Sequence, residues 1–362
     1  MSVSLFFYTV IMRKIIHVDM DCFFAAVEMR ENPALRDVPL AIGGSRERRG
    51  VISTCNYVAR RYGVRSAMAT ATAQRLCPQL VLLPGRMALY QQVSAQLQAI
   101  FARYSDCIEP LSLDEAYLDV SQARWCQGSA TRMAEAIRAD IRRELALTAS
   151  AGVAPNKFLA KIASEINKPD GLFVLPPEQV ATFVESLPLR KIPGIGQKSA
   201  ERLARAGLHT CGDVQRFAPY ELIRQFGKTG QMLLQRCQGI DERPVESERV
   251  RKSVGVETTL PVDLQTAEQA EEVMLHLLPD LLRRLQRHCR AESLIRQGVK
   301  LKFADFQQTT VERSVAGLQP ELWPRLLREA WLRAEGRSVR LVGISVGLPE
   351  MNYHSQQLSL DW

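Results

Sequence analysis

The most informative segment of the chain is Arg13-Lys-Ile-Ile-His-Val-Asp-Met-Asp-Cys-Phe-Phe-Ala-Ala-Val-Glu28. Residues 13–18 have the length and apolar character of a buried strand, and they lead directly to the acidic pair Asp19 and Asp21. A helical pattern follows from Phe24 to Met29. Because a carboxylate at the end of a buried strand is costly unless it is paired or binds a metal, the segment predicts a functional site at the edge of a sheet.

The alternation of strand and helix patterns continues to about residue 175, as in α/β or α+β cores. Residues 177 to about 239 then have the pattern of short helices separated by glycine turns, and residues 241–254 are mostly charged. Beyond them, two helical patterns and two strand patterns predict a compact α+β module. We therefore expect an α+β chain of several domains. The expected strands are 13–18, 38–42, 51–54, 116–120, 149–153, 298–303 and 340–346, and the expected helices are 24–29, 56–62, 91–104, 129–144, 268–287 and 322–333.

Composition favours an anionic partner. The chain has 362 residues, which is too long for one hydrophobic core, with a net charge of +8 and a pI of about 9.2. The charge is uneven: residues 30–75 carry nine arginines and three acidic residues, a net charge of +6. From residue 241 to the end, 17 basic and 18 acidic residues give −1. The positive charge therefore lies in the first half.

Other classes of protein are disfavoured. The eight cysteines contain no C-x-x-C pair, which predicts reduced thiols and no zinc site or disulfide framework. No apolar run reaches the ~18 residues of a membrane span. The apolar stretch 5–11 lacks the features of a signal peptide. We interpret residues 1–11 as a disordered extension or a wrongly assigned start before Met12, and we expect a cytoplasmic protein with no membrane partner.

A second acidic pair, Asp114 and Glu115, lies within Leu111-Ser-Leu-Asp-Glu-Ala-Tyr-Leu-Asp119. Taken singly, each carboxylate could equally be a helix cap or part of a surface turn. Two acidic sites at edges of one sheet suit a pair of divalent ions, because Mg²⁺ prefers hard oxygen ligands. Two such ions, about 3.5–4 Å apart, can hold the attacking and leaving oxygens of an in-line displacement.

Several long motifs follow one another in a recognisable order. They are His17-Val-Asp-Met-Asp-Cys-Phe-Phe-Ala-Ala-Val-Glu28, Thr54-Cys-Asn-Tyr-Val-Ala-Arg-Arg-Tyr-Gly63, Ser112-Leu-Asp-Glu-Ala-Tyr-Leu-Asp119, Ser150-Ala-Gly-Val-Ala-Pro-Asn-Lys-Phe-Leu-Ala-Lys-Ile-Ala163 and Asn167-Lys-Pro-Asp-Gly171. Together they resemble the Y family of lesion-bypass DNA polymerases, and the resemblance runs from Met12 almost to Trp362. It implies a right-hand fold: palm and fingers at 12–176 (fingers about 30–85), a helical thumb at 177–240, a linker at 241–254, a little finger at 255–350 and a tail at 351–362.

The resemblance also implies an activity. The chain would be a template-directed DNA polymerase of low fidelity, in which a primer 3′-hydroxyl attacks the α-phosphate of a deoxynucleoside triphosphate. Asp19, Asp114 and Glu115 would be catalytic and, with the Met20 carbonyl, would bind two Mg²⁺ ions. The residues expected at the nucleotide are Phe23, Phe24, Thr54, Tyr57, Arg60 and Lys168.

Without the motif, Arg60 and Lys168 fit a solvated helix face, and the two phenylalanines fit an ordinary core. In the family, the second aromatic excludes a ribose 2′-hydroxyl, which makes Phe24 the expected gate for sugar discrimination.

DNA and clamp contacts are expected outside the palm. Residues 191–200 carry a helix-hairpin-helix signature, in which Gly194, Gly196 and Lys198 would contact a phosphate. Lys300 and Lys302 alternate with apolar residues and share one strand face. The tail resembles the peptide by which bacterial polymerases bind the sliding clamp, through Gln357, Leu358, Leu360 and Trp362. We expect a monomer whose partners are primer–template DNA, deoxynucleoside triphosphates and the clamp.

Two alternatives stay open at this point. One is a non-catalytic family relative that acts as a DNA-binding accessory protein, although all three carboxylates are present. The other is a different two-metal enzyme, such as a nuclease or a nucleotide cyclase. The triphosphate motif disfavours a nuclease, and the thumb signature and the clamp-like tail disfavour a cyclase.

Overall fold

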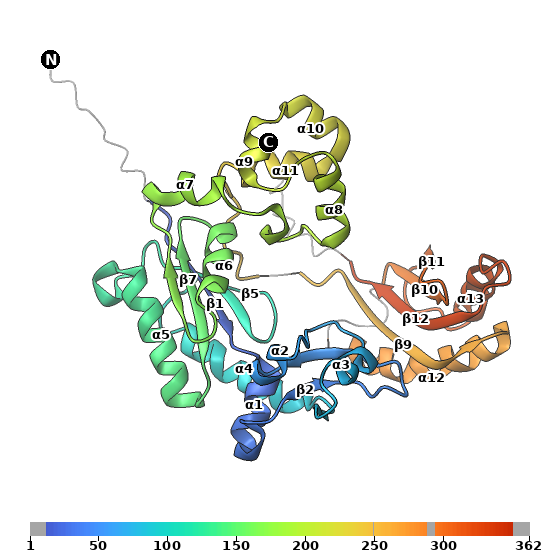
Figure 1. Cartoon of the computed structure of the whole chain (residues 1–362). Coiled ribbons are helices and arrows are strands. Elements are labelled where there is room, and N and C mark those ends of the chain that lie inside the picture. The colour runs from blue at the N-terminus through green and yellow to red at the C-terminus, as the bar shows by residue number, and fades with distance from the viewer. Residues whose placement is uncertain (1–11, 249, 288–293, 350–362) are drawn as a thin grey trace, which may run out of the picture. The chain divides into compact units, whose positions relative to one another are not determined.

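The computed structural model describes residues 12–248, 250–287 and 294–349 (Figure 1). They divide into two compact units. The first contains the residues up to 42, then 54–64 and 79–248; the second contains 43–53, 65–78 and the chain from 250 onward. In the described residues, no helix is both long enough and apolar enough to cross a membrane.

The first unit is built on a five-stranded sheet in the order β5-β6-β1-β7-β8. The central strand, β1, is antiparallel to both neighbours, and β7 and β8 are parallel. Both faces of β1 are covered, which fits the apolar residues at four of its six positions, while His17 and Asp19 are its two polar residues. The bounds are β1 Ile15–Met20, β5 Ile108–Pro110, β6 Glu115–Asp119, β7 Ala149–Ala154 and β8 Leu172–Val174.

The two faces of this sheet belong to two hydrophobic cores. Ile16, Val18 and Met20 pack into the first core with α1 (Phe23–Glu31), α4 (Met87–Phe101) and α5 (Ala130–Leu145). Ile15 packs into the second core, with α6 (Lys157–Ile166), which lies along β1 and β7 (Figure 1). Since side chains alternate along a strand, His17 and Asp19 share the face that α6 covers.

The thumb helices share that second core. Gly227, at φ 56° and ψ −131°, makes the turn between α10 and α11, a conformation that favours glycine. The bounds are α7 Val180–Glu185, α8 Gln197–Arg205, α9 Cys211–Arg216, α10 Pro219–Phe226 and α11 Lys228–Arg236, with 3₁₀ helices at Pro33–Leu35, Trp125–Gly128, Pro177–Gln179 and Leu189–Lys191.

A small three-stranded sheet has the order β3-β2-β4, with β2 and β4 parallel. Residues 43–50 form a tight turn in which the backbone of Gly50 comes close to that of Gly44. A Cβ on Gly50 would lie 2.2 Å from the carbonyl carbon of Gly44, so the turn requires glycine there. Asn56 caps the helix after β3 by accepting from the Ala59 N–H. The bounds are β2 Leu40–Gly43, β3 Ile52–Cys55, β4 Val81–Leu83, α2 Tyr57–Arg61 and α3 Thr70–Leu76.

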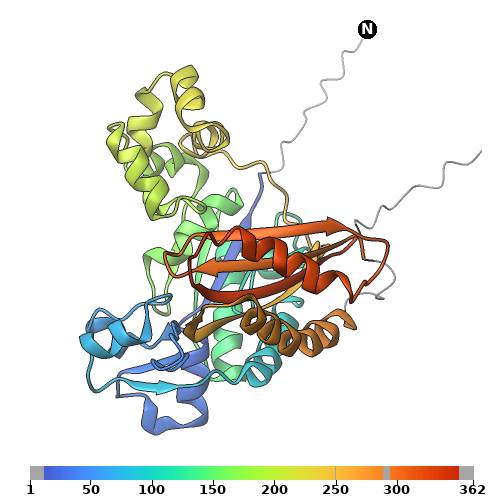
Figure 2. The ribbon, with the colours of Figure 1, turned by 90° about the vertical axis from the view of Figure 1, so that its right-hand side faces the viewer.

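The second unit contains an antiparallel four-stranded sheet in the order β11-β10-β12-β9. Its helices, α12 and α13, cover one face (Figure 2) and bury Trp323 at the centre of their own core. β9 begins at Ser253, inside the stretch that we expected to be a linker. The bounds are β9 Ser253–Leu264, β10 Arg296–Phe303, β11 Gln308–Ser314, β12 Val339–Gly347, α12 Ala267–Leu285 and α13 Leu322–Leu332.

Candidate active site

Three acidic side chains meet at one edge of the five-stranded sheet. Asp19 lies near the end of β1, and Asp114 and Glu115 lie at the start of β6. The antiparallel register pairs Asp19 with Glu115, and the Met20 N–H donates to the Asp114 carbonyl at 3.0 Å. Strand pairing therefore brings together residues almost a hundred positions apart in the sequence.

Each carboxylate has its own partner. Lys168 Nζ lies 2.8 Å from Asp19 Oδ1, Lys161 forms an ion pair with Glu115, and the Ser112 hydroxyl donates to Asp114 Oδ1 at 2.6 Å. Among the described residues, the structure contains no cluster of three or more Asp, Glu, His or Cys side chains close enough together to hold a metal ion. The donors nevertheless fit Mg²⁺, which binds through one or two carboxylates and keeps several waters. Asp19, Asp114, Glu115 and the Met20 carbonyl supply oxygens of that kind.

The environment separates the pKa values of two of these carboxylates. Burial raises the pKa of Asp19 to about 7, against the opposing effect of the Lys168 ammonium. Burial would also raise the pKa of Glu115, but the His17 ring and the Lys161 ammonium outweigh it and hold that pKa at about 2. Glu115 is therefore ionised at neutral pH without any further partner.

His17 lies directly behind Glu115. Its ring is fully buried, with Nδ1 2.8 Å from Ser164 Oγ and Nε2 3.2 Å from Glu115 Oε2. Nε2 forms no hydrogen bond of good geometry within the described chain. Burial lowers the pKa of His17 to about 4, so the ring is neutral at neutral pH. Nothing in the sequence alone marks His17 or Lys161 as a partner of Glu115, because their proximity depends on the packing of α6 over β1.

Phe23 and Phe24 have different environments. Phe23 is 2% exposed and belongs to the core, whereas Phe24 is only partly buried and packs at its edge. The ring of Phe24 stacks on Tyr90, with centroids 4.3 Å apart and an interplanar angle of 14°. Of the two side chains, only that of Phe24 is partly accessible.

Tyr57 and Arg60 project from α2. The Arg60 guanidinium lies 4.6 Å from the centre of the Tyr57 ring. Burial raises the pKa of the Cys22 thiol to about 12, and Arg60 and Lys168 both act on this thiol in the opposite direction. Thr54 lies on β3 and is half-buried; no described contact joins it to either cation.

Asp21 connects these elements, and the sequence analysis assigned it no role. Its side chain is 2% exposed and accepts hydrogen bonds from the Ser150 hydroxyl at 2.8 Å and from the Asp170 N–H at 2.8 Å. The Tyr57 hydroxyl lies 3.4 Å from the same carboxylate. Asp21 thus joins β1 to α2 and to the loop that carries Lys168. The only hint of this role in the sequence is that Asp21 forms an acidic pair with Asp19.

The thumb hairpin presents two exposed glycines. Gly194 has φ +94°, and Gly196 precedes α8 with φ −77°. A Cβ built on either would meet no atom within 4 Å. Lys198 lies exposed in the first turn of α8. A hollow of about 900 Å³ extends from this hairpin to Lys161 and Glu165 on α6.

The other predicted contacts lie in the second unit or beyond the described residues. Lys300 and Lys302 share the open face of β10, as the alternation predicted. Lys300 Nζ is 2.9 Å from Glu257, and Lys302 Nζ is 5.0 Å from the centre of the Phe306 ring. The proposed clamp peptide, with Gln357, Leu358, Leu360 and Trp362, lies outside the described part of the chain.

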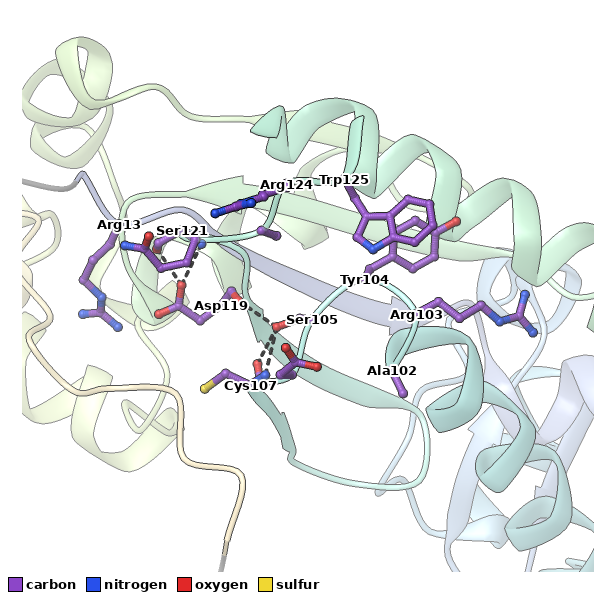
Figure 3. Close-up of a pocket in the computed structure, with 13 residues that line it drawn as sticks. Arg13, Ala102, Arg103, Tyr104, Ser105, Cys107, Asp119, Ser121, Arg124 and Trp125 are labelled. Carbon is purple, nitrogen blue, oxygen red and sulfur yellow. Dashed lines mark hydrogen bonds between the residues drawn. The ribbon is translucent and has the colours of Figure 1, made fainter. Parts of the chain in front are cut away.

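A second hollow, of about 780 Å³, lies at the opposite end of β1 and β6 (Figure 3). Arg13, Asp119 and the exposed Trp125 contribute to its lining. The Ser105 hydroxyl, in the same wall, donates to the Asp119 carbonyl at 2.7 Å (Figure 3). None of the site residues expected from the sequence lines this hollow, so it is separate from the acidic cluster.

Family models match most of the chain. Residues 18–165 match the impB/mucB/samB family, residues 190–241 match the DNA polymerase-iota thumb domain, and residues 251–360 match the impB/mucB/samB family C-terminal domain. A protein named DNA polymerase IV from Aeromonas hydrophila subsp. hydrophila is 61% identical over 350 residues, covering 97% of this chain and 99% of its own.

Solved structures agree with these matches. A Y-family DNA polymerase chimera, Dbh-Dpo4(243-245)-Dbh, superposes with a TM-score of 0.83 at 30% identity, covering 92% of this chain and 98% of its own. An insertion ternary complex of Dbh DNA polymerase has a TM-score of 0.66 at 29% identity, with coverage of 92% and 98%. The predicted right-hand α+β fold and the family resemblance are confirmed, and the chain belongs to the Y family of DNA polymerases.

Proposed function

We propose that the chain's translesion DNA polymerase activity is carried by the acidic cluster of Asp19, Asp114 and Glu115. The main support for this proposal is the pairing of β1 with β6, which brings the three carboxylates together at one edge of the sheet. When two Mg²⁺ ions are bound there, they supply charge stabilisation for an in-line displacement at phosphorus. The protein's own part is to hold oxygen ligands in place, with Lys161 and His17 keeping Glu115 ionised.

The residues around Cys22 are proposed to bind the triphosphate. Arg60 has a planar guanidinium, which matches phosphate geometry, and Lys168 would add an ammonium that its ion pairs with Asp19 and Glu165 hold near the end of β1. Tyr57 and Thr54 would complete this pocket from α2 and β3. Phe24 would contact the sugar with its partly accessible ring and exclude a 2′-hydroxyl, while Phe23 would support the same end of α1 from the core.

DNA and a deoxynucleoside triphosphate are the partners of a Y-family polymerase. For the thumb, the support comes from Gly196: its φ is ordinary and its surroundings are open, so nothing in the described fold requires glycine there. A close approach by a phosphate, with backbone N–H groups as donors, would require it. Gly194 and Lys198 lie on the same hairpin, and Lys300 and Lys302 would add contacts from the little finger.

The finer partner assignments rest on sequence. The tail from Gln357 to Trp362 resembles a clamp-binding peptide, so we propose that a sliding clamp tethers the enzyme by its tail. We also propose that the protein acts as a monomer in the cytoplasm, since one chain supplies all the residues that we place in the catalytic site. The domain limits 12–176, 177–240, 241–254 and 255–350 remain proposals of the same kind.

A primer-extension assay tests the site assignment. We expect addition of single deoxynucleotides to a primed template, with Mg²⁺ required, and loss of that activity in Asp114→Asn. An accessory protein without catalysis is not favoured, because the family match and all the carboxylates are present. Equal activity of the Asp114→Asn variant and the unchanged protein would show that the reaction centre has been misplaced.

A further inference from the structure

Phe24, the proposed sugar gate, does not stand alone. Its ring stacks on the ring of Tyr90 with centroids 4.3 Å apart and an interplanar angle of 14°. Tyr90 belongs to α4 and is fully buried. The Phe23 ring, 6.4 Å from Tyr90 and tilted by 58°, packs beside the pair. One face of Phe24 is therefore covered by a ring that is itself fully buried.

Tyr90 is itself held at its far end. Its hydroxyl donates to Glu28 Oε1 at 2.6 Å, and Arg86 Nε donates to the same oxygen at 2.9 Å. Glu28 is 4% exposed, and a buried carboxylate keeps its position only with such partners. Burial raises the pKa of Tyr90 to about 12, so the hydroxyl remains a donor at neutral pH. The contacts thus run from Arg86 through Glu28 and Tyr90 to Phe24.

We propose that Tyr90 is a positioning residue for sugar discrimination: it holds the Phe24 ring against the incoming sugar, and Glu28 fixes Tyr90. The proposal rests on the gate function proposed for Phe24. A steric gate rejects a 2′-hydroxyl only while its ring cannot retreat. In a close-packed interior a stacked ring has no room to move, whereas a smaller residue at position 90 leaves space directly behind Phe24.

The competing explanation is that Tyr90 is only a core aromatic. In that case its truncation lowers the melting temperature and leaves sugar preference unchanged. The two explanations separate in one measurement, the ratio of kcat/KM for a ribonucleotide to kcat/KM for the matching deoxynucleotide. This ratio does not fall or rise with the amount of folded enzyme, because both substrates report on the same active molecules.

The experiment compares the unchanged protein with four variants of the full chain: Phe24→Ala, Tyr90→Leu, Tyr90→Phe and Phe101→Leu. We expect Tyr90→Leu to raise the ratio by about tenfold, and Phe24→Ala to raise it further. Tyr90→Phe keeps the ring but loses the hydrogen bond to Glu28, so we expect a smaller rise of about threefold. Phe101 is the matched control, since it lies on the same helix and is equally buried.

The outcomes are distinct. If Phe24→Ala admits ribonucleotides and Tyr90→Leu does not, the function assigned to Tyr90 is overturned and the gate stands. If neither variant admits them, the gate itself is wrong. A rise in Phe101→Leu as large as in Tyr90→Leu would point to general loosening of the core and would also overturn the proposal. Should Tyr90→Leu not fold, Glu28→Gln is the substitute: we expect about a threefold rise, and an unchanged ratio counts against the proposal.

Discussion

Lys168 Nζ lies 2.8 Å from Asp19 Oδ1 and 2.8 Å from Glu165 Oε1, so one ammonium joins the end of β1 to the end of α6. We expect this ammonium to be the one that also meets the triphosphate. Lys168→Ala should then raise KM for deoxynucleotides by about tenfold or more, since hydrogen bonds to charged groups contribute about 1.5–3 kcal/mol. Steady-state insertion of a single nucleotide measures this. Lys198→Ala is the control, and it should change DNA affinity without changing that KM.

The acidic cluster should be needed for chemistry and not for DNA binding. Asp114→Asn and Glu115→Gln each remove one charge at the sheet edge while keeping the side-chain size. We expect extension to be lost in both, with primer–template affinity nearly intact, because in the proposed site the carboxylates would face the reacting phosphate and the thumb would hold the duplex. Fluorescence anisotropy on labelled DNA gives the affinity. Near-normal turnover of either variant would show that the metal ligands are assigned wrongly.

Gly196→Ala separates DNA binding from folding. The alanine Cβ meets no atom within 4 Å and φ is −77°, so we expect an unchanged melting temperature. DNA affinity should fall by a similar factor for every sequence, since phosphate contacts carry no base information. Gly194→Ala differs, because φ is +94° there and the backbone would also be strained. A loss of affinity that depends on sequence would contradict the phosphate model.

Glu28→Gln should produce a stability change with a defined pH dependence. Burial would raise the pKa of Glu28, but hydrogen bonds from Arg86 and Tyr90 outweigh it and hold the pKa below its usual value of 4.5. The stabilisation of the fold by ionised Glu28 is therefore complete above pH 4.5. It is lost as the pH falls through the lower pKa that Glu28 has in the folded protein. We expect the variant to lose about 1–3 kcal/mol at pH 7 and the same at pH 5. Denaturant titrations at pH 7, 5 and 4 test this, and only the last should show a smaller difference.

The sequence predicted β1, β6 and β7 and the helices α1, α4 and α5 of the first unit because their patterns are local, but it did not predict α6. β1 was expected at residues 13–18 but runs over Ile15–Met20, since antiparallel pairing with β6 and β7 carries the strand through the charged Asp19. β5 and β8 have three residues each, too few for a periodic signal. No strand was expected at β9 or β11, the two edge strands of the second sheet, because an edge strand need not alternate cleanly.

The residues of the site also fall into those that the sequence identifies and those that it does not. Asp19, Asp114 and Glu115 could be found from motifs, since each follows or begins a recognisable strand. Asp21, Lys161 and Tyr90 could not be assigned, because their importance lies in contacts made across the fold. Tyr90 is 66 positions from Phe24 and looks like any aromatic residue of an amphipathic helix until the rings are seen to stack. Local patterns identify such residues as buried or charged, and only packing shows what they hold.

The tail should affect processivity without affecting chemistry. A variant that lacks Gln357 to Trp362 keeps every residue that we place near the nucleotide, so single-nucleotide insertion should be unchanged. Tethering to a clamp raises only the effective concentration of enzyme at the primer end, and that gain should vanish with the tail. Extension of a long primed template, with and without a loaded clamp, gives the measurement. Replacing Leu358, Leu360 and Trp362 by alanine should have the same effect as deletion, because a few buried anchor side chains carry most of the binding energy of an interface. Equal clamp stimulation of the truncated and full-length proteins would mean that the clamp binds elsewhere on the chain.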